Sequence, residues 1–201
     1  MAFRTFADAE EAAQYAASLD ERWPDRTAIK AHLSKQLNSI PAPHVAEFCA
    51  GAGALAAQLL TDHPHMTYTG IDISPQLLTV ARTRLADYAA RTTWLESDLN
   101  QDGWMEKVAM PIHTFVSLQS IHDLGDETAV ARIFTLAAQC LAPGGRLIYA
   151  DLLAVEPPEE NTNPGRLPVE CHLELLRAAG FTTATCTWTA GPFGCFHAQI
   201  A

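Results

Sequence analysis

The hydrophobic positions of this chain follow two repeats, one typical of helices and the other of buried strands. Near the N-terminus, apolar side chains recur at helical spacing over residues 8–19 and again after Asp25. In the second of these segments, one face carries Ile29, Leu33, Leu37 and Ile40. Pro41 and Pro43 follow, and because proline cannot continue a helix, they predict its end.

From residue 45 onward, short apolar runs alternate with longer amphipathic segments. Strands are expected over 45–50, in the run ending at Asp72, over 92–96, from about Phe115, and within 141–152. Helices are expected over 75–88, 126–141 and 170–179, with Ser74 and Asp126 as N-terminal caps and Gly180 as a stop. Strands that alternate with helices pair in parallel through right-handed crossovers.

The last two strands break this alternation. They are expected over residues 181–190 and 195–200, and only residues 191–194 join them. This link is too short for a parallel crossover, so it predicts an antiparallel hairpin.

Gly51 and Gly53 follow the strand at 45–50, directly before the helix expected to open near Ala54. Because glycine has no Cβ atom, each position lets a ligand approach the backbone at the helix start. The next strand ends on Asp72, where a carboxylate can accept hydrogen bonds from both hydroxyls of a ribose. The pattern therefore predicts a site for an adenosine-like cofactor.

NAD is one alternative, because residues 51–56 also fit G-x-G-x-x-A, and Asp72 lies nineteen residues beyond Gly53. Glu47 favours another ligand, since a carboxylate inside this strand repels a pyrophosphate and attracts a cationic cofactor with an amino group. The third strand leads into Asp98, which can accept a hydrogen bond from the exocyclic amine of adenine. A sulfonium amino acid fits these charges best.

With these features, a Leu-Ala-Pro-Gly-Gly segment at 141–145 and the terminal hairpin, residues 42–201 resemble the class I S-adenosylmethionine-dependent methyltransferases. The resemblance implies an α/β fold: a Rossmann-like seven-stranded sheet in the order 3-2-1-4-5-7-6, strand 7 antiparallel, helices on both faces. It also implies that L-x-P-G-G precedes the fifth strand. The implied cofactor is S-adenosyl-L-methionine, with S-adenosyl-L-homocysteine as its product.

The cofactor contacts that this resemblance implies are Glu47, Cys49, Gly51, Gly53, Asp72, Ile73, Asp98, Leu99 and Ser117. Cys49 departs from the family pattern, because it stands where the family has the first glycine of its loop. A side chain pointing inward at this position would crowd the methionine part of the cofactor.

His122 follows the fourth strand and Asp151 ends the fifth, so both are expected at the edge of the sheet where ligands bind. Methyl transfer from a sulfonium depends mainly on alignment, but a base helps where the acceptor is a hydroxyl or an acidic carbon. His122 is the candidate base, because histidine titrates near neutrality; the alternative is a turn residue that packs the cofactor. Asp151 is a candidate for orienting the acceptor, or it caps a loop.

Charge narrows the range of partners. With 23 Asp and Glu against 13 Lys and Arg, the formal net charge is −10, which opposes binding to phosphate backbones and makes a nucleic-acid substrate unexpected. Residues 1–25 contain no apolar run of signal-peptide or membrane-spanning length, so we expect no membrane association and a cytoplasmic location.

The five cysteines favour a reducing compartment, because any disulfide scheme leaves one unpaired and none forms C-x-x-C. A zinc site is conceivable among Cys171, His172, Cys186, Cys195 and His197. Their spacings match no ligand template, so no metal is expected.

One domain over residues 1–201 is expected, with an N-terminal helical cover (1–41) on a cofactor-binding core (42–201). The insertion at 153–168 is short and rich in Pro, Glu and Asn, so the N-terminal helices and the hairpin must cover the acceptor. Candidate wall residues, each of them alternatively a core residue, are Phe3, Phe6, Tyr15, Trp23, Phe193 and Phe196.

A small-molecule acceptor is the favoured interpretation, since no extended docking element is evident. The alternatives are a protein or peptide methyltransferase, a non-catalytic relative that binds S-adenosylmethionine, and an NAD-dependent oxidoreductase. A homodimer and a monomer both remain open.

Overall fold

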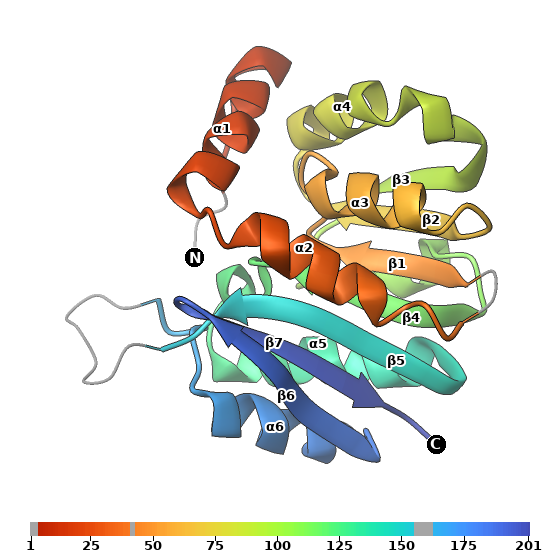
Figure 1. The fold of residues 1–201 in the computed structure, drawn as a ribbon, viewed down its shortest axis with the longest axis vertical. Coiled ribbons are helices and arrows are strands. Elements are labelled where there is room, and N and C mark those ends of the chain that lie inside the picture. Colours follow the sequence, from red (N-terminus) through yellow and green to blue (C-terminus); the bar gives the residue numbers. More distant parts are fainter. Residues whose placement is uncertain (1–3, 41–42, 155–162) are drawn as a thin grey trace.

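The seven strands of the central sheet lie in the order β3-β2-β1-β4-β5-β7-β6 in the computed structural model, which describes residues 4–40, 43–154 and 163–201 (Figure 1). Their bounds are β1 His44–Phe48, β2 Thr67–Asp72, β3 Thr92–Glu96, β4 Ile112–Leu118, β5 Leu141–Leu152, β6 Thr183–Ala190 and β7 Phe193–Gln199. Strand β7 runs antiparallel to β5 and β6, and the other pairs are parallel. Both the predicted sheet order and the terminal hairpin are confirmed.

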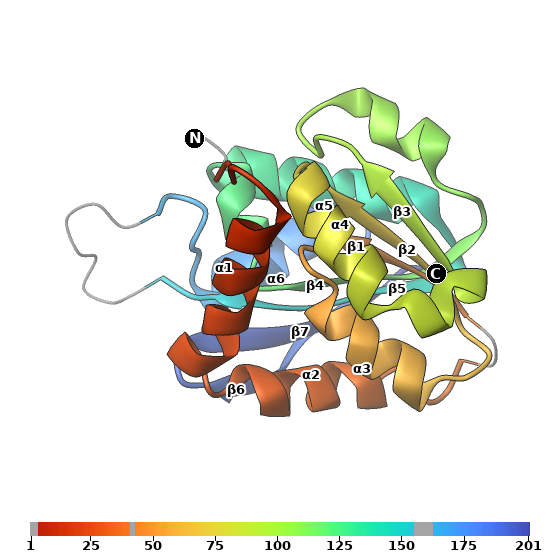
Figure 2. The same cartoon turned by 90° about the horizontal axis from the view of Figure 1, so that it is seen from above.

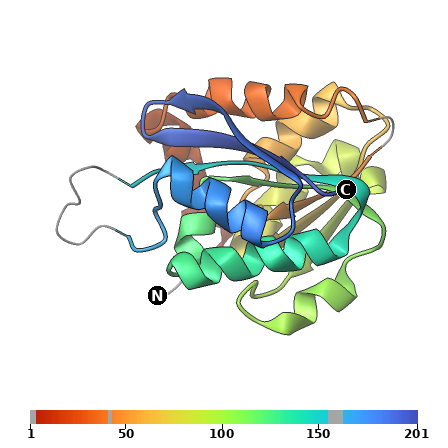
Figure 3. The same cartoon turned by 90° about the horizontal axis from the view of Figure 1, so that it is seen from below.

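Helices cover both faces of this sheet. The α-helices are α1 Ala9–Arg22, α2 Arg26–Lys35, α3 Ala54–Asp62, α4 Pro75–Arg84, α5 Glu127–Cys140 and α6 Val169–Ala178. Short 3₁₀ helices are η1 Ala86–Arg91, η2 Asp102–Lys107 and η3 Ile121–Leu124. Helices α2, α3 and α4 lie on one face and α5 and α6 on the other (Figures 2 and 3), while α1 lies at the carboxyl ends of the central strands (Figure 1). In the described part of the chain, no helix has the length and apolar character needed to span a bilayer.

Two apolar clusters, one on each face, hold the layers together. Beneath α5 and α6, the Phe48 and Phe115 rings stack with centroids 4.4 Å apart, and Trp104 packs edge-on against both. Beneath α2 and α3, the predicted helix face is buried, since Ile29 and Leu33 are fully inaccessible. Burial of such apolar area is the main stabilising contribution to a sheet covered on both sides.

The predicted capping residues are confirmed, because Ser74 accepts the Leu77 N–H (3.2 Å) and Asp126 accepts the Ala129 N–H (3.1 Å). Gly180 follows α6 with a φ of 103°, which glycine adopts without steric cost. The caps place the starts of α4 and α5 beside the carboxyl ends of β2 and β4.

Several boundaries differ from the sequence prediction; strand β7, for example, begins at Phe193 and not at residue 195. Helix α2 ends at Lys35 rather than at Pro41, because tight turns follow in which the Leu37 N–H bonds the Ser34 carbonyl. Helix α4 ends at Arg84 and gives way to η1 instead of continuing to residue 88. L-x-P-G-G does not precede β5: the strand begins at Leu141, and its pairing with β4 shifts between Leu141 and Arg146.

Candidate active site

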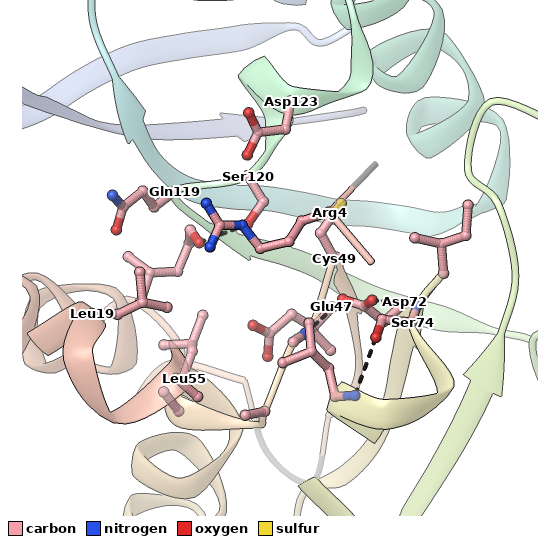
Figure 4. A pocket seen from close by; sticks show the side chains of 18 of the residues that line it. Arg4, Leu19, Glu47, Cys49, Leu55, Asp72, Ser74, Gln119, Ser120 and Asp123 are labelled. Atoms are coloured by element: carbon pink, nitrogen blue, oxygen red, sulfur yellow. Dashed lines mark hydrogen bonds between the residues drawn. The ribbon is translucent and has the colours of Figure 1, made fainter. Parts of the chain in front are cut away.

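A cavity of about 480 Å³ opens at the carboxyl ends of the central strands (Figure 4). Segments that follow β1, β2, β3 and β4 line it, together with the end of β5 and side chains from α1 and α2. This is where a parallel sheet binds ligands, at the point where the strand order reverses on either side of β1 and β4. A cavity therefore lies where the sequence predicts the site.

The loop after β1 contains two glycines that serve different purposes. Gly51 (φ 54°) borders the cavity, and a Cβ atom added there would meet nothing closer than the Cys49 carbonyl oxygen at 4.0 Å. Gly53 (φ 72°) is outside the cavity lining, and a Cβ there would lie 2.9 Å from Leu85 Cδ1. Gly51 therefore leaves space for a ligand, whereas Gly53 allows the start of α3 to pack against the segment after α4.

Cys49 has a φ of 52°, a left-handed conformation that costs a non-glycine residue about 1–2 kcal/mol. Its side chain borders the cavity (Figure 4). Burial raises the pKa of the thiol well above its ordinary value, so the sulfur stays neutral. The residue that replaces the family's glycine thus adds a small apolar group to the wall.

Glu47 lies at the floor of the cavity and is only 2% exposed. Burial raises the pKa of its carboxyl group to about 8, and the hydrogen bond from Tyr68 Oη (2.6 Å) and the charge of Arg26 offset part of that shift. A buried carboxyl group with this pKa is mostly protonated at pH 7, and it ionises when a cation is placed beside it.

Asp72 ends β2 and points into the loop after β1. One carboxylate oxygen accepts the Gly51 N–H and the other accepts the Ser74 N–H, both at 2.8 Å. Burial raises the pKa of this carboxyl group even though these backbone donors act in the opposite direction. Each oxygen retains a second lone pair, so Asp72 can accept two further hydrogen bonds from a ligand in the cavity.

Asp98 lines the same cavity beyond the end of β3, together with Ser97 and Leu99. Its Oδ1 accepts the Asn100 N–H at 2.8 Å, which fixes the turn after the strand. Ile73, the remaining predicted residue of this group, also lies in the lining. Acidic side chains from three adjacent strand ends therefore gather along one half of the cavity.

His122 stands in the other half, in η3, with its side chain 5% exposed. Asp151 accepts twice from this residue, from the backbone N–H at 2.8 Å and from Nδ1 at 2.5 Å. Because a carboxylate can only accept, Nδ1 carries a proton, and in the neutral imidazole Nε2 keeps the lone pair, 3.4 Å from Asp123 Oδ1. The arrangement leaves a histidine nitrogen free to accept a proton.

The pKa of His122 is raised above its ordinary value. Burial alone lowers it, but the charge and hydrogen bond of Asp151, with a smaller contribution from Asp123, outweigh that effect. The charge of Arg166 acts in the opposite direction. His122 is therefore a stronger base than a histidine in water.

Three predicted residues lie outside the cavity lining. Ser117 is fully buried and donates to the Phe48 carbonyl at 3.1 Å, so it joins β4 to β1 instead of facing a ligand. Gly53 packs against Leu85. Asp151 is fully buried behind His122, so it orients that histidine and not an acceptor.

The predicted aromatic wall is partly present. Phe6, Tyr15 and Trp23 line the cavity, whereas Phe193 and Phe196 are fully buried in the two clusters of the core. Phe3 lies outside the described residues. The aromatic part of the cavity wall thus comes from the N-terminal segment and not from the hairpin.

Arginine side chains at the cavity were missed by sequence reasoning, namely Arg4, Arg22, Arg26, Arg84 and Arg166. Among them, Arg26 donates Nη1 to Gln119 Oε1 and Nε to Asp20 Oδ1 (2.8 Å), which joins α2 to the segment after β4. No short motif marks these arginines, because they come from segments far apart in the sequence.

A model of the methyltransferase domain family matches residues 46–147. The ribosomal RNA small subunit methyltransferase C of Pseudomonas aeruginosa (strain LESB58) is 30% identical over 141 residues, which is 69% of this chain and 42% of that protein. The chain spans less than half the length of the curated relatives that it matches.

Solved structures show the same fold. Human N-acetylserotonin methyltransferase, in complex with SAM, superimposes with a TM-score of 0.72 at 17% identity, over 96% of this chain and 56% of that one. The N-methyltransferase NodS from Bradyrhizobium japonicum WM9 superimposes with a TM-score of 0.69 at 21% identity, over 90% of this chain and 97% of that one. At these identities the likeness concerns the fold alone.

Proposed function

This chain belongs to the class I S-adenosylmethionine-dependent methyltransferases, and from that premise we propose that it methylates a small-molecule acceptor through in-line displacement, with His122 as the base. The observation that carries the proposal is the buried Asp151 carboxylate, which holds His122 so that Nε2 is free at the cavity. A base held in this way has a purpose only where the acceptor loses a proton as it reacts.

The acidic half of the cavity, which contains Glu47, Asp72 and Asp98, fits the cofactor of this family, and we call it the cofactor half. The half that contains His122 is called the acceptor half. The space above Gly51, the two open acceptor sites of Asp72 and the ionisable Glu47 suit a nucleoside that carries an ammonium group. Asp72 would accept from the ribose hydroxyls, Glu47 from the amino group, and Asp98 from the adenine amine. When bound, S-adenosylmethionine supplies an activated methyl group on a positively charged sulfur.

His122 acts on the acceptor. Its Nε2 accepts the proton of a hydroxyl or an acidic carbon while the nucleophile is held in line, and Asp151 stabilises the imidazolium ion that forms. A neutral amine already presents a lone pair and needs no base before it attacks. The acceptor class that we propose is therefore a hydroxyl or carbon acid.

The size and charge of the protein support a small acceptor over a macromolecule. The aromatic side chains of Phe6, Tyr15 and Trp23 line the cavity, which suits an organic molecule with apolar surface. With a net charge of −10, the chain would be repelled by an RNA backbone, even though one relative acts on ribosomal RNA according to its name.

A methyl-transfer assay with three acceptor classes tests the proposal. We would incubate the protein with S-adenosylmethionine and pooled phenols, β-dicarbonyl compounds or primary amines, and detect S-adenosylhomocysteine and the methylated product by mass spectrometry. Turnover of a phenol or a dicarbonyl compound is expected. Product that forms only on filter-retained protein, or only on amines, would contradict the proposed acceptor class.

The dependence of the rate on pH tests the role of Asp151. The rate should rise with pH as His122 loses its proton, because only the neutral imidazole can act as a base. Since Asp151 raises the pKa of His122, Asp151→Asn should move this rise to lower pH while reducing the maximal rate. An unchanged profile would mean that another group accepts the proton.

A further inference from the structure

Positive charge is concentrated at the cavity of an otherwise acidic protein. Of the 13 Lys and Arg residues in the chain, five line this one cavity, at positions 4, 22, 26, 84 and 166. The lining also contains four acidic residues: Glu47, Asp72 and Asp98 lie at the ends of β1, β2 and β3, and Asp123 lies beside His122. Among the cations of the lining, Arg166 acts on His122, and a positive charge at that place attracts anions.

Two of these arginines are held by other parts of the protein. Arg26 binds Asp20 and Gln119, and Arg84 donates Nη1 to the Ala52 carbonyl at 2.9 Å. Their planar groups are engaged in joining α2 and α4 to the loops of the site. We therefore assign them to the architecture of the site rather than to a ligand.

Arg166 is different, because its side chain forms no ion pair and no hydrogen bond within the described residues. Its Nε atom is buried without a partner. Buried polar groups are nearly always paired, and leaving a charged donor unpaired costs free energy. A guanidinium group of this kind in a cavity wall is suited to a ligand that brings the missing acceptor atoms.

The backbone holds Arg166 beside the proposed base. A Cβ atom at Gly165 would lie 2.2 Å from the His122 carbonyl oxygen, so only glycine lets this segment approach η3 so closely. On the other side, Leu167 is buried, and its carbonyl accepts the Ala154 N–H at 3.2 Å. The charge of Arg166 is close enough to lower the pKa of His122, in agreement with this placement.

Two further arginines line the cavity from the N-terminal part of the chain. The Arg4 guanidinium lies 4.3 Å from the centroid of the Tyr15 ring and that of Arg22 lies 5.3 Å from it, on the α1 side of the lining. In Figure 4, Arg4 extends into the cavity. Neither forms an ion pair with a described carboxylate, so their positive field adds to that of Arg166.

We propose that the acceptor carries an oxyanion, a carboxylate or a phosphate, and that the Arg166 guanidinium binds it while the reacting group faces His122. The proposal rests on the function proposed above and narrows it to anionic acceptors. The guanidinium fork matches the two oxygens of a carboxylate or phosphate, so it fixes orientation as well as providing affinity. Arg166 is then the residue that determines specificity.

Calorimetric titration with three aromatic probes tests this inference without turnover. The probes are benzoate, phenyl phosphate and the neutral benzamide, added to the protein alone and to the protein saturated with S-adenosylhomocysteine. We expect at least one anion to bind about tenfold more tightly than benzamide, and the tighter of the two identifies the preferred oxyanion. Arg166→Gln should remove this preference and Arg166→Lys should retain part of it.

Arg177→Gln is the matched control, because Arg177 is exposed at the end of α6 and outside the cavity. It should leave the preference for the anion unchanged. Equal affinity of all three probes, no binding of either anion, or an Arg166→Gln variant that still prefers the anion would each overturn the inference. If Arg166→Gln does not fold, Arg166→Lys keeps the comparison with Arg177→Gln available.

Failure of the inference and failure of the proposed function give different results. If the anions bind through Arg166 but the enzyme methylates only amines, the base mechanism is wrong and the anion site stands. If neutral phenols are methylated at the same rate by the unaltered protein and by Arg166→Gln, and the anions do not bind, only the inference is wrong.

Discussion

The two halves of the cavity differ in how the chain builds them. In the cofactor half, Glu47, Asp72 and Asp98 each lie within two residues of a strand end, on three neighbouring strands. In the acceptor half, His122 depends on Asp151 from another strand, and Arg166 comes from a third segment. The first half follows from strand register, and the second follows from packing between distant segments.

The two halves also differ in the charged groups that a ligand can meet. Glu47, Asp72 and Asp98 lie in the first half, whereas the second contains Arg166 together with Asp123. A cation therefore fits the first half, and an anion finds Arg166 in the second. Variants that alter only one half at a time show whether the protein uses the two halves for two different ligands.

The largest difference between the effects on turnover and on cofactor affinity is expected from His122→Ala, which alters the acceptor half alone. Turnover should fall about a hundredfold or more, because general-base catalysis typically contributes that much. The dissociation constant of S-adenosylmethionine should stay within about twofold of that of the unaltered protein, since His122 contributes nothing to the acidic half. Steady-state rates and calorimetry provide the two numbers.

The control for this variant is His65→Ala, an exposed histidine after α3 that lies outside the cavity. It should change neither quantity. If His122→Ala reacts nearly as fast as the unaltered protein, the comparison fails, and His122 is a packing residue of the turn after β4.

Asp72→Ala should weaken cofactor binding and leave turnover at saturating cofactor nearly unchanged, the reverse of His122→Ala. The affinity for S-adenosylmethionine and S-adenosylhomocysteine should fall by about 2 kcal/mol, roughly thirtyfold, because charge-assisted hydrogen bonds to the ribose are lost. The rate at saturating cofactor should change little. Calorimetric titration measures the affinity, and Asp87→Asn, at an exposed position, serves as the control. Unchanged binding would remove Asp72 from the cofactor site.

Glu47 provides a smaller effect that depends on pH. With a pKa of about 8, only about a tenth of the empty protein has an ionised Glu47 at pH 7, so the affinity for a cation should rise up to about tenfold between pH 7 and pH 9. Binding at pH 7 should also release a proton, which calorimetry in buffers of different ionisation enthalpy detects. Glu47→Gln should weaken binding and abolish both effects.

The same group affects folding. Its pKa in the folded protein lies above the ordinary value of 4.5, so the empty protein loses stability as the pH rises from about 4.5 to about 8. Glu47→Gln cannot ionise and should lose less stability over that range. Denaturant unfolding at several pH values measures the difference, and parallel profiles for the two proteins would argue against a buried, protonated Glu47.

Cys49→Gly is expected to have the smallest effect. Glycine accepts the φ of 52° without steric cost but loses more conformational entropy on folding, so we expect a net stabilisation of no more than about 1 kcal/mol. Removal of a side chain from the wall should raise cofactor affinity a few fold. Cys49→Ala separates the two causes, because it removes the sulfur and keeps the backbone cost. A gain equal to that of Cys49→Gly would assign the effect to the sulfur alone.

The capping residues and the acidic residues at the strand ends could be predicted because each depends on a local pattern, whereas the sheet order was implied by the resemblance to the family. Asp72 ends the buried strand β2, and its side chain accepts the N–H of Gly51 in the loop after β1. The family assignment, made on the same residues, is confirmed by the match over residues 46–147.

Predictions failed where the direction of a side chain depends on a neighbouring element. Ser117 was assigned to the cofactor from its place on the strand, but the sheet turns it toward the Phe48 carbonyl. Asp151 was placed at the mouth of the site, yet the turn after β4 lies between it and the cavity. Arg4 and Arg166 reach the same cavity from segments more than 150 residues apart, and no periodicity encodes that meeting.

The wall contributed by α1 has a consequence for how such an enzyme can diversify. The cover over the acceptor is drawn from one uninterrupted stretch, residues 4–40, that precedes β1, whereas the groups proposed to react belong to the strand ends that follow it. A single recombination point before β1 would exchange the aromatic part of the wall and preserve both the proposed base and Arg166. With a counterpart of Arg26, whose bond to Gln119 anchors the cover, the new wall would vary the neutral part of the acceptor while Arg166 still selects its anion.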